Sequence, residues 1–390
     1  MLAAICCFFL LSGVSQVAAQ GQRPAIVGQI LGITDPMIRQ VVQRRDDNVG
    51  RILVVGTYSG NVDGFQAMST VRPGMSGTPR GWTPLVDLTI FEGHFIGIFR
   101  QPAGGFYDLQ FRPTFQGQVG SPVNVFAVGV GEVFITAGQS NSTNWGSRTG
   151  FVPDLRVSSF NPGNGRGMDT NFPGASWQWG IDPQPTLDRS VDGSAWPLMA
   201  SNLAEALNVP IGLYSSGYGG TLIEQWLPGQ VIEPASATSP QIVLFDHLIY
   251  AIEYLNGRGG VRAVLWDQGE SDYGFQTNPA LYQANLRYLI NESRIITGVP
   301  VKWMVAKAAT PLTVALADRQ AIEAAQAAVV DNVLTFPGPD TDSVGLAYRV
   351  PSPIGPLHFN AAGLTLLGGY WGIYVNNLPG FLAPGELPGY

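Results

Sequence analysis

The chain has 390 residues, a net charge of −7 and a charged fraction of only 13%. Nucleic-acid binding needs clustered lysine and arginine, so this balance argues against a nucleic-acid partner. Both cysteines, Cys6 and Cys7, lie in the first apolar segment, which leaves the rest of the chain without a disulfide, a thiolate metal site or a cysteine nucleophile. The length is generous for one hydrophobic core and comfortable for two.

Residues 1–19 read as a secretory signal peptide. An apolar run of about a dozen residues is followed by small residues that allow cleavage after Ala19. The run is too short to span a bilayer, and no later segment reaches the length of a membrane span. We expect a secreted or periplasmic protein without a membrane span; the sequence does not indicate an oligomeric state.

Residues 22–128 show short strands and turns, with no helical period of useful length. The segment GFYDLQFRP alternates apolar and polar side chains, with Tyr107, Leu109 and Phe111 on one face. Such alternation is typical of a half-buried strand. We therefore expect a small all-β sandwich domain in this part of the chain.

Residues 129–380 change period and alternate apolar runs with helical patterns. The apolar runs are 133–136, 211–216, 261–266, 301–306 and 333–336. The helical patterns are about 195–208, 241–256, 279–296, 315–331 and 360–376. This order predicts an α/β domain of three α/β/α layers with a parallel sheet buried on both faces. Ligands of such sheets bind at the carboxyl ends of the strands.

The stretch VFITAGQSNS ends a strand at one of those carboxyl ends and presents Ser140. Alone, it is either a nucleophile or a strand meeting a polar turn. A serine nucleophile needs a base with a pKa near neutral, and His358 is the natural choice because it lies in a loop before a helix. The other two histidines, His94 and His247, fall in a strand and in a helix, where we expect structural roles.

Two further strand ends carry groups that acyl transfer requires. Gly219 belongs to a glycine pair that either presents an N–H to an oxyanion or makes an ordinary turn. In DQGESD, Gln268 could donate its amide to the same oxyanion and Glu270 could orient a protonated histidine, unless the segment is only a polar loop.

These blocks, AGQSN, SSGYGGTLIEQW, WDQGESD and LHF, resemble the SGNH hydrolase superfamily over about residues 130–375. Within it, they resemble the carbohydrate esterases that are like sialate O-acetylesterases and acetylxylan esterases. The resemblance implies Ser140 as nucleophile and His358 as base. It also implies an oxyanion hole made of the backbone N–H groups of Ser140 and Gly219 and the side chain of Gln268.

The final block departs from the family pattern. Family members have D-x-x-H, whereas Gly355 stands at the aspartate position here. Glu270 is the first candidate for the third member of the triad, as in some acetylxylan-esterase-like relatives. A Ser–His dyad and three other acids remain alternatives: Asp340, Asp342 and Asp272.

The resemblance implies serine-dependent removal of O-acetyl groups from carbohydrate, from sialic acid or from an acetylated polysaccharide, with no metal or organic cofactor. The alternatives are a catalytically inactive carbohydrate-binding protein and an esterase for lipid or aryl esters. The sequence does not identify the glycan. Six aromatic residues near the motif blocks could offer ring faces to a sugar: Trp145, Trp177, Trp179, Tyr218, Trp226 and Tyr273.

Overall fold

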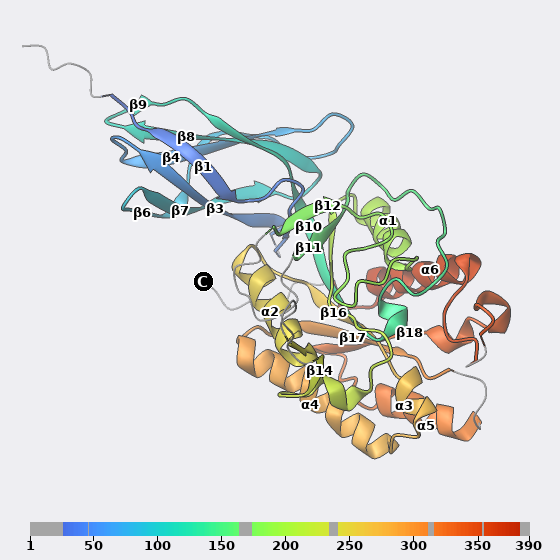
Figure 1. Ribbon diagram of the computed structural model, residues 1–390. Helices are drawn as coiled ribbons and strands as arrows, with labels where there is room; N and C mark the ends of the chain where they lie inside the picture. The colour runs from blue at the N-terminus through green and yellow to red at the C-terminus, as the bar shows by residue number, and fades with distance from the viewer. Residues whose placement is uncertain are drawn as a thin grey trace, which may run out of the picture.

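The computed structural model describes residues 26–45, 47–163, 174–233, 241–310, 316–352 and 355–382 (Figure 1). The expected signal peptide, residues 1–19 with both cysteines, lies outside them. Strands occupy the first part of the described chain, and strands alternate with helices in the rest. None of the helices in the described ranges is long and apolar enough to cross a membrane.

Residues 26–122 form strands, and their described part contains no helix. Strands β1, β3, β7 and β6 make one antiparallel sheet, while β4, β5, β8 and β9 pair beside it. Tyr107, Leu109 and Phe111 of β8 are fully buried, as their alternation predicted. The strands are β1 (Gln29–Asp35), β2 (Val41–Gln43), β3 (Val49–Ser59), β4 (Gly64–Val71), β5 (Arg80–Pro84), β6 (Val86–Phe91), β7 (His94–Pro102), β8 (Phe106–Phe115) and β9 (Gln118–Val119).

The rest of the chain is built on a sheet of order β12-β11-β13-β10-β16-β17-β18. Its neighbours pair in parallel except for β12, which runs antiparallel to β11. All five expected apolar runs are strands of this sheet. The strands are β10 (Val123–Gly138), β11 (Val157–Asn161), β12 (Ser176–Trp179), β13 (Ile211–Ser215), β16 (Ala263–Asp267), β17 (Lys302–Lys307) and β18 (Thr335–Asp340), with a separate pair β14 (Val231–Glu233) and β15 (Ile242–Val243).

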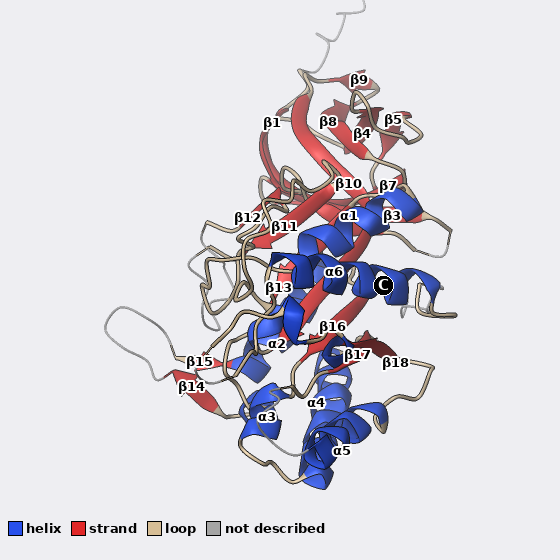
Figure 2. Cartoon of the chain, turned by 90° about the vertical axis from the view of Figure 1, so that its right-hand side faces the viewer, coloured by secondary structure: helices blue, strands red, loops and turns tan. Residues whose placement is uncertain are grey.

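Helices cover both faces of this sheet. On one face α1 and α6 lie side by side (Figure 1 and Figure 2) and share a core with the even-numbered residues of β10, such as Phe134. On the other face α2, α4 and α5 pack against odd-numbered residues such as Ile135. The helices are α1 (Trp196–Leu207), α2 (Leu244–Gly257), α3 (Glu270–Gly274), α4 (Pro279–Thr297), α5 (Leu316–Ala327) and α6 (Ala361–Asn377). The predicted three layers are present because each strand is apolar on both sides.

Strand β10 runs across residues 128 and 129, the expected domain boundary. Its first half pairs antiparallel with β8, and its second half is the centre of the parallel sheet. The two parts therefore share one continuous strand, and a division into two domains at this point stays a prediction. The β region nevertheless has a hydrophobic cluster of its own.

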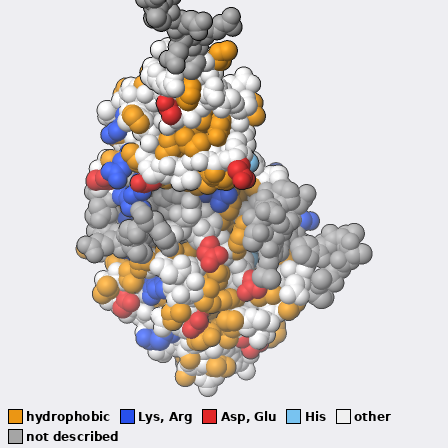
Figure 3. Space-filling view, turned by 90° about the vertical axis from the view of Figure 1, so that its left-hand side faces the viewer, with side chains coloured by type: hydrophobic (Ala, Val, Ile, Leu, Met, Phe, Trp, Pro, Cys, Tyr) orange, Lys and Arg blue, Asp and Glu red, His pale blue; other side chains and the backbone are white. Residues whose placement is uncertain are grey.

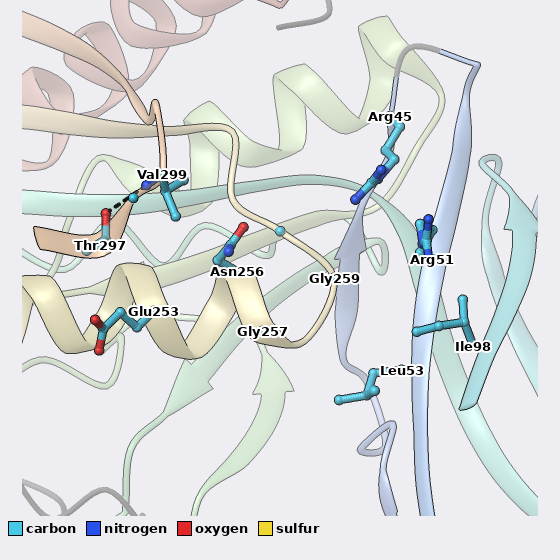
Figure 4. A pocket seen from close by; sticks show the side chains of 12 residues that line it. Arg45, Arg51, Leu53, Ile98, Glu253, Asn256, Gly257, Gly259, Thr297 and Val299 are labelled. Carbon is cyan, nitrogen blue, oxygen red and sulfur yellow. Dashed lines mark hydrogen bonds between the residues drawn. The ribbon is translucent and has the colours of Figure 1, made fainter. Parts of the chain in front are cut away.

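A cavity of about 380 Å³ lies between the two parts. Figure 4 shows Arg45, Arg51 and Leu53 from the β region facing Asn256 and Thr297 at the carboxyl ends of α2 and α4. Its lining segments precede β16 and β17, which places it at the amino edge of the parallel sheet. The expected site lies at the opposite edge, so this cavity is not part of it.

The face of the molecule in Figure 3 carries a patch of hydrophobic side chains on the β region, with acidic and basic side chains scattered around it. Strands β6 and β7 expose several apolar residues, among them Val86, Phe91 and Ile96. The β region thus keeps part of its apolar surface on the outside, whereas the strands of the parallel sheet are covered on both faces.

Candidate active site

Ser140 follows the central strand of the parallel sheet. β10 ends at Gly138, and Ser140 begins the short 3-10 helix η1 (Ser140–Ser142) between the ends of β13 and β16. The residue is 5% exposed, and its Oγ makes no hydrogen bond within the described part of the chain. The carboxyl end of a central parallel strand is where ligands of such sheets bind, so Ser140 is placed at the expected edge.

His358 lies in the loop before α6, beside the segment that carries Ser140. The Nδ2 of Asn141 donates to the carbonyl of Leu357 at 3.4 Å, and the amide of Ser147 donates to the carbonyl of Phe359 at 2.9 Å. The indole of Trp145 packs against the imidazole, with 5.5 Å between ring centroids. Residues that follow Ser140 thus contact His358 and both of its neighbours, although no hydrogen bond joins the side chains of Ser140 and His358.

Arg349 holds the loop of His358 in place. Its Nη1 donates to the carbonyl of Leu357 at 2.6 Å, and its guanidinium lies over the ring of Phe359 at 4.2 Å. Burial, followed by the positive charge of Arg349, lowers the pKa of His358 from its ordinary value. A histidine with a lowered pKa is neutral at pH 7 and therefore ready to accept a proton.

Glu270, the first candidate for the third triad member, makes no hydrogen bond to His358 among the described residues. One of its oxygens accepts from Nδ2 of Asn141, and the other has no hydrogen bond among the described residues. Burial raises the pKa of Glu270 to about 7, and the charge of Asp342 adds to the rise. Hydrogen bonds from its own backbone amide and from Asn141, and the charge of Arg349, oppose it. Asn141 therefore contacts both Glu270 and the backbone carbonyl of Leu357, the residue before His358.

The alternative acids are also engaged elsewhere. Asp340 caps the short helix η3 (Thr341–Ser343) by accepting the amides of residues 342 and 343. Asp342 accepts the amides of residues 309 and 310 and pairs with Arg349 at 3.4 Å. Asp272 accepts from Gln268 and from the amide of residue 223. Gly355, at the family's aspartate position, has a φ of +99°. The described residues thus contain no carboxylate hydrogen-bonded to His358.

Two of the three expected oxyanion donors, Gln268 and Gly219, make hydrogen bonds to protein acceptors. Gln268 is fully buried, and its amide nitrogen donates to Asp272 at 2.5 Å and to the carbonyl of Thr221 at 3.0 Å. The hydroxyl of Tyr282 donates to its carbonyl oxygen at 2.9 Å. The N–H of Gly219 donates to Oδ2 of Asp188 at 3.1 Å. Both expected donors are therefore committed to protein acceptors, and their role toward an oxyanion stays a prediction.

Two aspartates that the sequence did not indicate, Asp267 and Asp188, lie at this edge of the sheet. Asp267 ends β16 and is fully buried, with the indole of Trp371 beside its carboxylate. Burial, then the charge of Glu270, raises its pKa well above the ordinary value. Asp188, from the segment after β12, binds Gly219 and Trp145. No motif surrounds Asp188, and only the position of Asp267 at a strand end could have drawn attention to it.

The other two histidines have the structural positions that their sequence contexts predicted. His247 is buried in α2 with its Nε2 3.4 Å from the hydroxyl of Tyr214, and burial lowers its pKa to about 4. His94 lies on β7 of the β region and stacks on Phe91. Neither residue belongs to the edge of the sheet that carries Ser140.

Comparison with known proteins gives concordant results. A family model described as carbohydrate esterase, sialic acid-specific acetylesterase, matches residues 130–370. Sialate O-acetylesterases of Pongo abelii and Homo sapiens are each 25% identical over 218 residues, which cover 49% of this chain and 40% of theirs. The chain thus spans less than half the length of these relatives. The crystal structure of a carbohydrate acetylesterase from Xanthomonas citri has a TM-score of 0.56 at 18% identity, over 89% of this chain and 75% of that one; this likeness shows a shared fold.

Proposed function

Because the chain belongs to the carbohydrate esterase, sialic acid-specific acetylesterase family, we propose that it removes O-acetyl groups from carbohydrate with Ser140 as nucleophile and His358 as base. The resemblance predicted from the four motif blocks is confirmed at the level of this family of ester hydrolases. The observation that carries the proposal is the position of Ser140, with an unbonded Oγ, at the end of the central strand and beside the loop of His358.

The proposed reaction has two steps. Nε2 or Nδ1 of His358 takes the proton of Ser140 Oγ while the oxygen attacks the acetyl carbonyl, and the tetrahedral intermediate expels the sugar alkoxide, which receives that proton. Water then attacks the acetyl-serine while His358 takes its proton, and the bond from the acetyl carbon to Ser140 Oγ breaks. His358 returns the proton to Oγ, and acetate leaves. The lowered pKa of His358 keeps its imidazole neutral and able to accept the first proton.

The oxyanion is the part of the proposal that needs rearrangement. The N–H of Ser140 belongs to the nucleophile itself and needs no movement to lie near the reacting carbonyl. The N–H of Gly219, in contrast, donates to Asp188. For Gly219 to contribute, the carboxylate of Asp188 must share or release that N–H. The amide of Gln268 would have to leave Asp272 as well. Each donor that reaches the oxyanion typically contributes about 10²- to 10³-fold in rate.

The test is acetate release by Ser140→Ala from acetylated xylan, xylose tetraacetate, O-acetylated sialic acid and p-nitrophenyl acetate. We expect a loss of at least about 10³-fold on every substrate that the wild type hydrolyses. Ser293→Ala is the matched control, because Ser293 is an equally buried serine in α4, remote from the sheet edge. Activity of Ser140→Ala at the wild-type level would remove Ser140 from the mechanism.

The same substrates separate the alternatives. An inactive carbohydrate-binding protein retains affinity for glycans and leaves p-nitrophenyl acetate intact. An esterase for lipid esters prefers long acyl chains, whereas a carbohydrate deacetylase loses rate beyond two or three carbons. Export directed by residues 1–19 is also part of the proposal; cell fractionation of the full chain, with and without those residues, tests it.

A further inference from the structure

The indole of Trp145 is the most exposed of the six aromatic rings expected near the motif blocks. Of the six aromatic residues expected near the motif blocks, three are buried: Trp177, Trp226 and Tyr273. Trp179 and Tyr218 are partly buried and use their polar atoms in hydrogen bonds. Trp145 is 48% exposed and lies against the imidazole of His358. An indole that stays half in solvent beside a base leaves an apolar face available to a ligand.

The indole is fixed by Asp188. Its Nε1 donates to Oδ2 of Asp188 at 2.9 Å, and the same oxygen accepts from Oγ1 of Thr143 at 3.0 Å and from the N–H of Gly219. The other oxygen, Oδ1, accepts from the amide and the hydroxyl of Ser190 at 3.0 and 2.7 Å. Five donors therefore hold one carboxylate, and the ring is oriented before any ligand arrives.

Gly219 explains why the ring fits where it does. A Cβ on this residue would lie 2.8 Å from Nε1 and 3.1 Å from Cε2 of Trp145. Both atoms belong to a rigid ring whose position Asp188 fixes, so a side chain at residue 219 would displace the indole. The first glycine of the GG pair thus serves close packing against Trp145 as well as any role of its N–H.

The place of the indole relative to His358 decides which part of the substrate it would meet. In the proposed reaction, His358 returns its proton to the oxygen of the leaving sugar, so that oxygen must reach the imidazole. The sugar ring attached to it then extends over the neighbouring surface, and Trp145 provides that surface. The C–H bonds of a pyranose face carry partial positive charge, which suits the negative face of an indole.

We propose that Trp145, held by Asp188, is the stacking platform for the sugar ring that leaves as alcohol, and so determines the preference for sugar acetates over simple alkyl acetates. This inference rests on the proposed esterase function. It assigns Trp145 to substrate specificity and Asp188 to positioning.

The test compares kcat/KM for xylose tetraacetate and for ethyl acetate, which has no ring. In Trp145→Ala we expect the ratio of the two values to fall on the order of tenfold, mainly through a higher KM for the sugar acetate, because one stacked ring contact is lost. Trp145→Phe keeps a ring and should restore part of the ratio. Tyr288→Ala is the control, since Tyr288 is exposed to a similar extent, 47%, on the outer side of α4.

Asp188→Asn tests the positioning role. The variant weakens the hydrogen bond to the indole, and we expect a smaller fall of the same ratio. The double variant with Trp145→Ala should show no further fall, because both changes act through one ring. Equal losses on both substrates in Trp145→Ala, or a ratio within twofold of wild type, would overturn the platform. Wild-type hydrolysis of ethyl acetate without any of xylose tetraacetate would overturn it too, while inactivity on both esters would instead refute the proposed function on which it rests.

Discussion

Glu132 and Glu270 are buried glutamates at opposite edges of the same parallel sheet. Glu132, in β10 at the amino edge, accepts hydrogen bonds from Gln43 and from the guanidinium groups of Arg44 and Arg262, at 2.6 to 3.2 Å. Glu270, at the carboxyl edge, accepts a hydrogen bond from Asn141 on one oxygen, and its other oxygen has none among the described residues. One carboxylate is fully compensated, and the other is not.

The difference corresponds to the different roles of the two edges of the sheet. The amino edge joins the β region to the α/β region, because Gln43 and Arg44 belong to the former and Arg262 to the latter. The carboxyl edge gathers Glu270 and Asp267, whose pKa values burial raises. Groups with strongly shifted pKa values often mark functional sites. Charge is therefore neutralised where the fold is held together and left poorly compensated where the reaction is proposed.

The largest expected effect is at the amino edge. Glu132→Ala leaves the two largely covered guanidinium groups of Arg44 and Arg262, 19% and 10% exposed, without their counter-charge. We expect the free energy of unfolding to fall by about 3 kcal/mol. Urea denaturation followed by tryptophan fluorescence measures it. Glu205→Ala, an exposed change on α1, should stay within about 0.5 kcal/mol of wild type. A loss below 1 kcal/mol in Glu132→Ala would show that the compensated charges at the amino edge do not hold the two parts of the fold together.

The next largest effect is at the carboxyl edge. Here we expect a substitution, Glu270→Gln, to raise the free energy of unfolding at high pH instead of lowering it. The pKa of Glu270 is about 7 in the folded chain and near its ordinary 4.5 when unfolded. Its contribution to stability is thus fully present below about pH 4.5 and is lost as the pH rises through 7. Glu270→Gln removes this loss and keeps an acceptor for Asn141. We expect its stability relative to wild type to rise by about 1–3 kcal/mol between pH 5 and pH 8.

Urea unfolding of both proteins at four pH values across that range measures the difference. Asp331→Asn is a useful contrast, because hydrogen bonds from residues 333–335 accompany a lowered pKa of Asp331. Its stability relative to wild type should fall with rising pH in the acid range, not rise. A flat difference for Glu270→Gln would mean that the glutamate is compensated by groups at the carboxyl edge after all.

A smaller effect concerns the pH dependence of the rate. Burial and Arg349 lower the pKa of His358, so the acid limb of kcat/KM should have its midpoint below 6.5. A histidine with a pKa of 6.5 would retain about one quarter of the plateau rate at pH 6, and we expect more than that. The same limb should persist in Glu270→Gln. A limb that vanishes in that variant would belong to Glu270 and not to the histidine.

The parallel sheet was predictable because its strands are continuous apolar runs between helical patterns, and Ser140 followed from the end of one of them. The uninterrupted course of β10 was not predictable from the sequence, because Gly129 and Gly131 are residues typical of a turn. In the structure they let Pro210 and the strand pack closely; a side chain at Gly131 would overlap the carbonyl of Pro210. Local sequence shows a glycine but not the neighbour that requires it.

The candidate site was predictable to the extent that its residues stand at strand ends. Gln268 was correctly placed after β16, but the direction of its amide depends on Tyr282 and Thr221, which tertiary packing brings to it. Asp188 lies in a segment without a periodic pattern or a motif, and only the folded chain shows that it binds Trp145. The acceptor toward which a side-chain amide or carboxylate turns depends on residues far apart in the sequence. The place of a residue at a strand end therefore does not predict its hydrogen-bond partners.

The smallest expected effect is an ion pair in the β region. Arg51 and Asp87 meet at 2.7 Å, but the Asp87 side chain is 64% exposed, so solvent screens the pair. Asp87→Asn also suits the positive φ of 51° at this residue, since asparagine tolerates that conformation. We expect a loss of at most about 0.5 kcal/mol that disappears in 0.5 M salt. A loss comparable to that of Glu132→Ala would mean that the presence of an ion pair, and not its burial at the junction, decides how much a charge stabilises this fold.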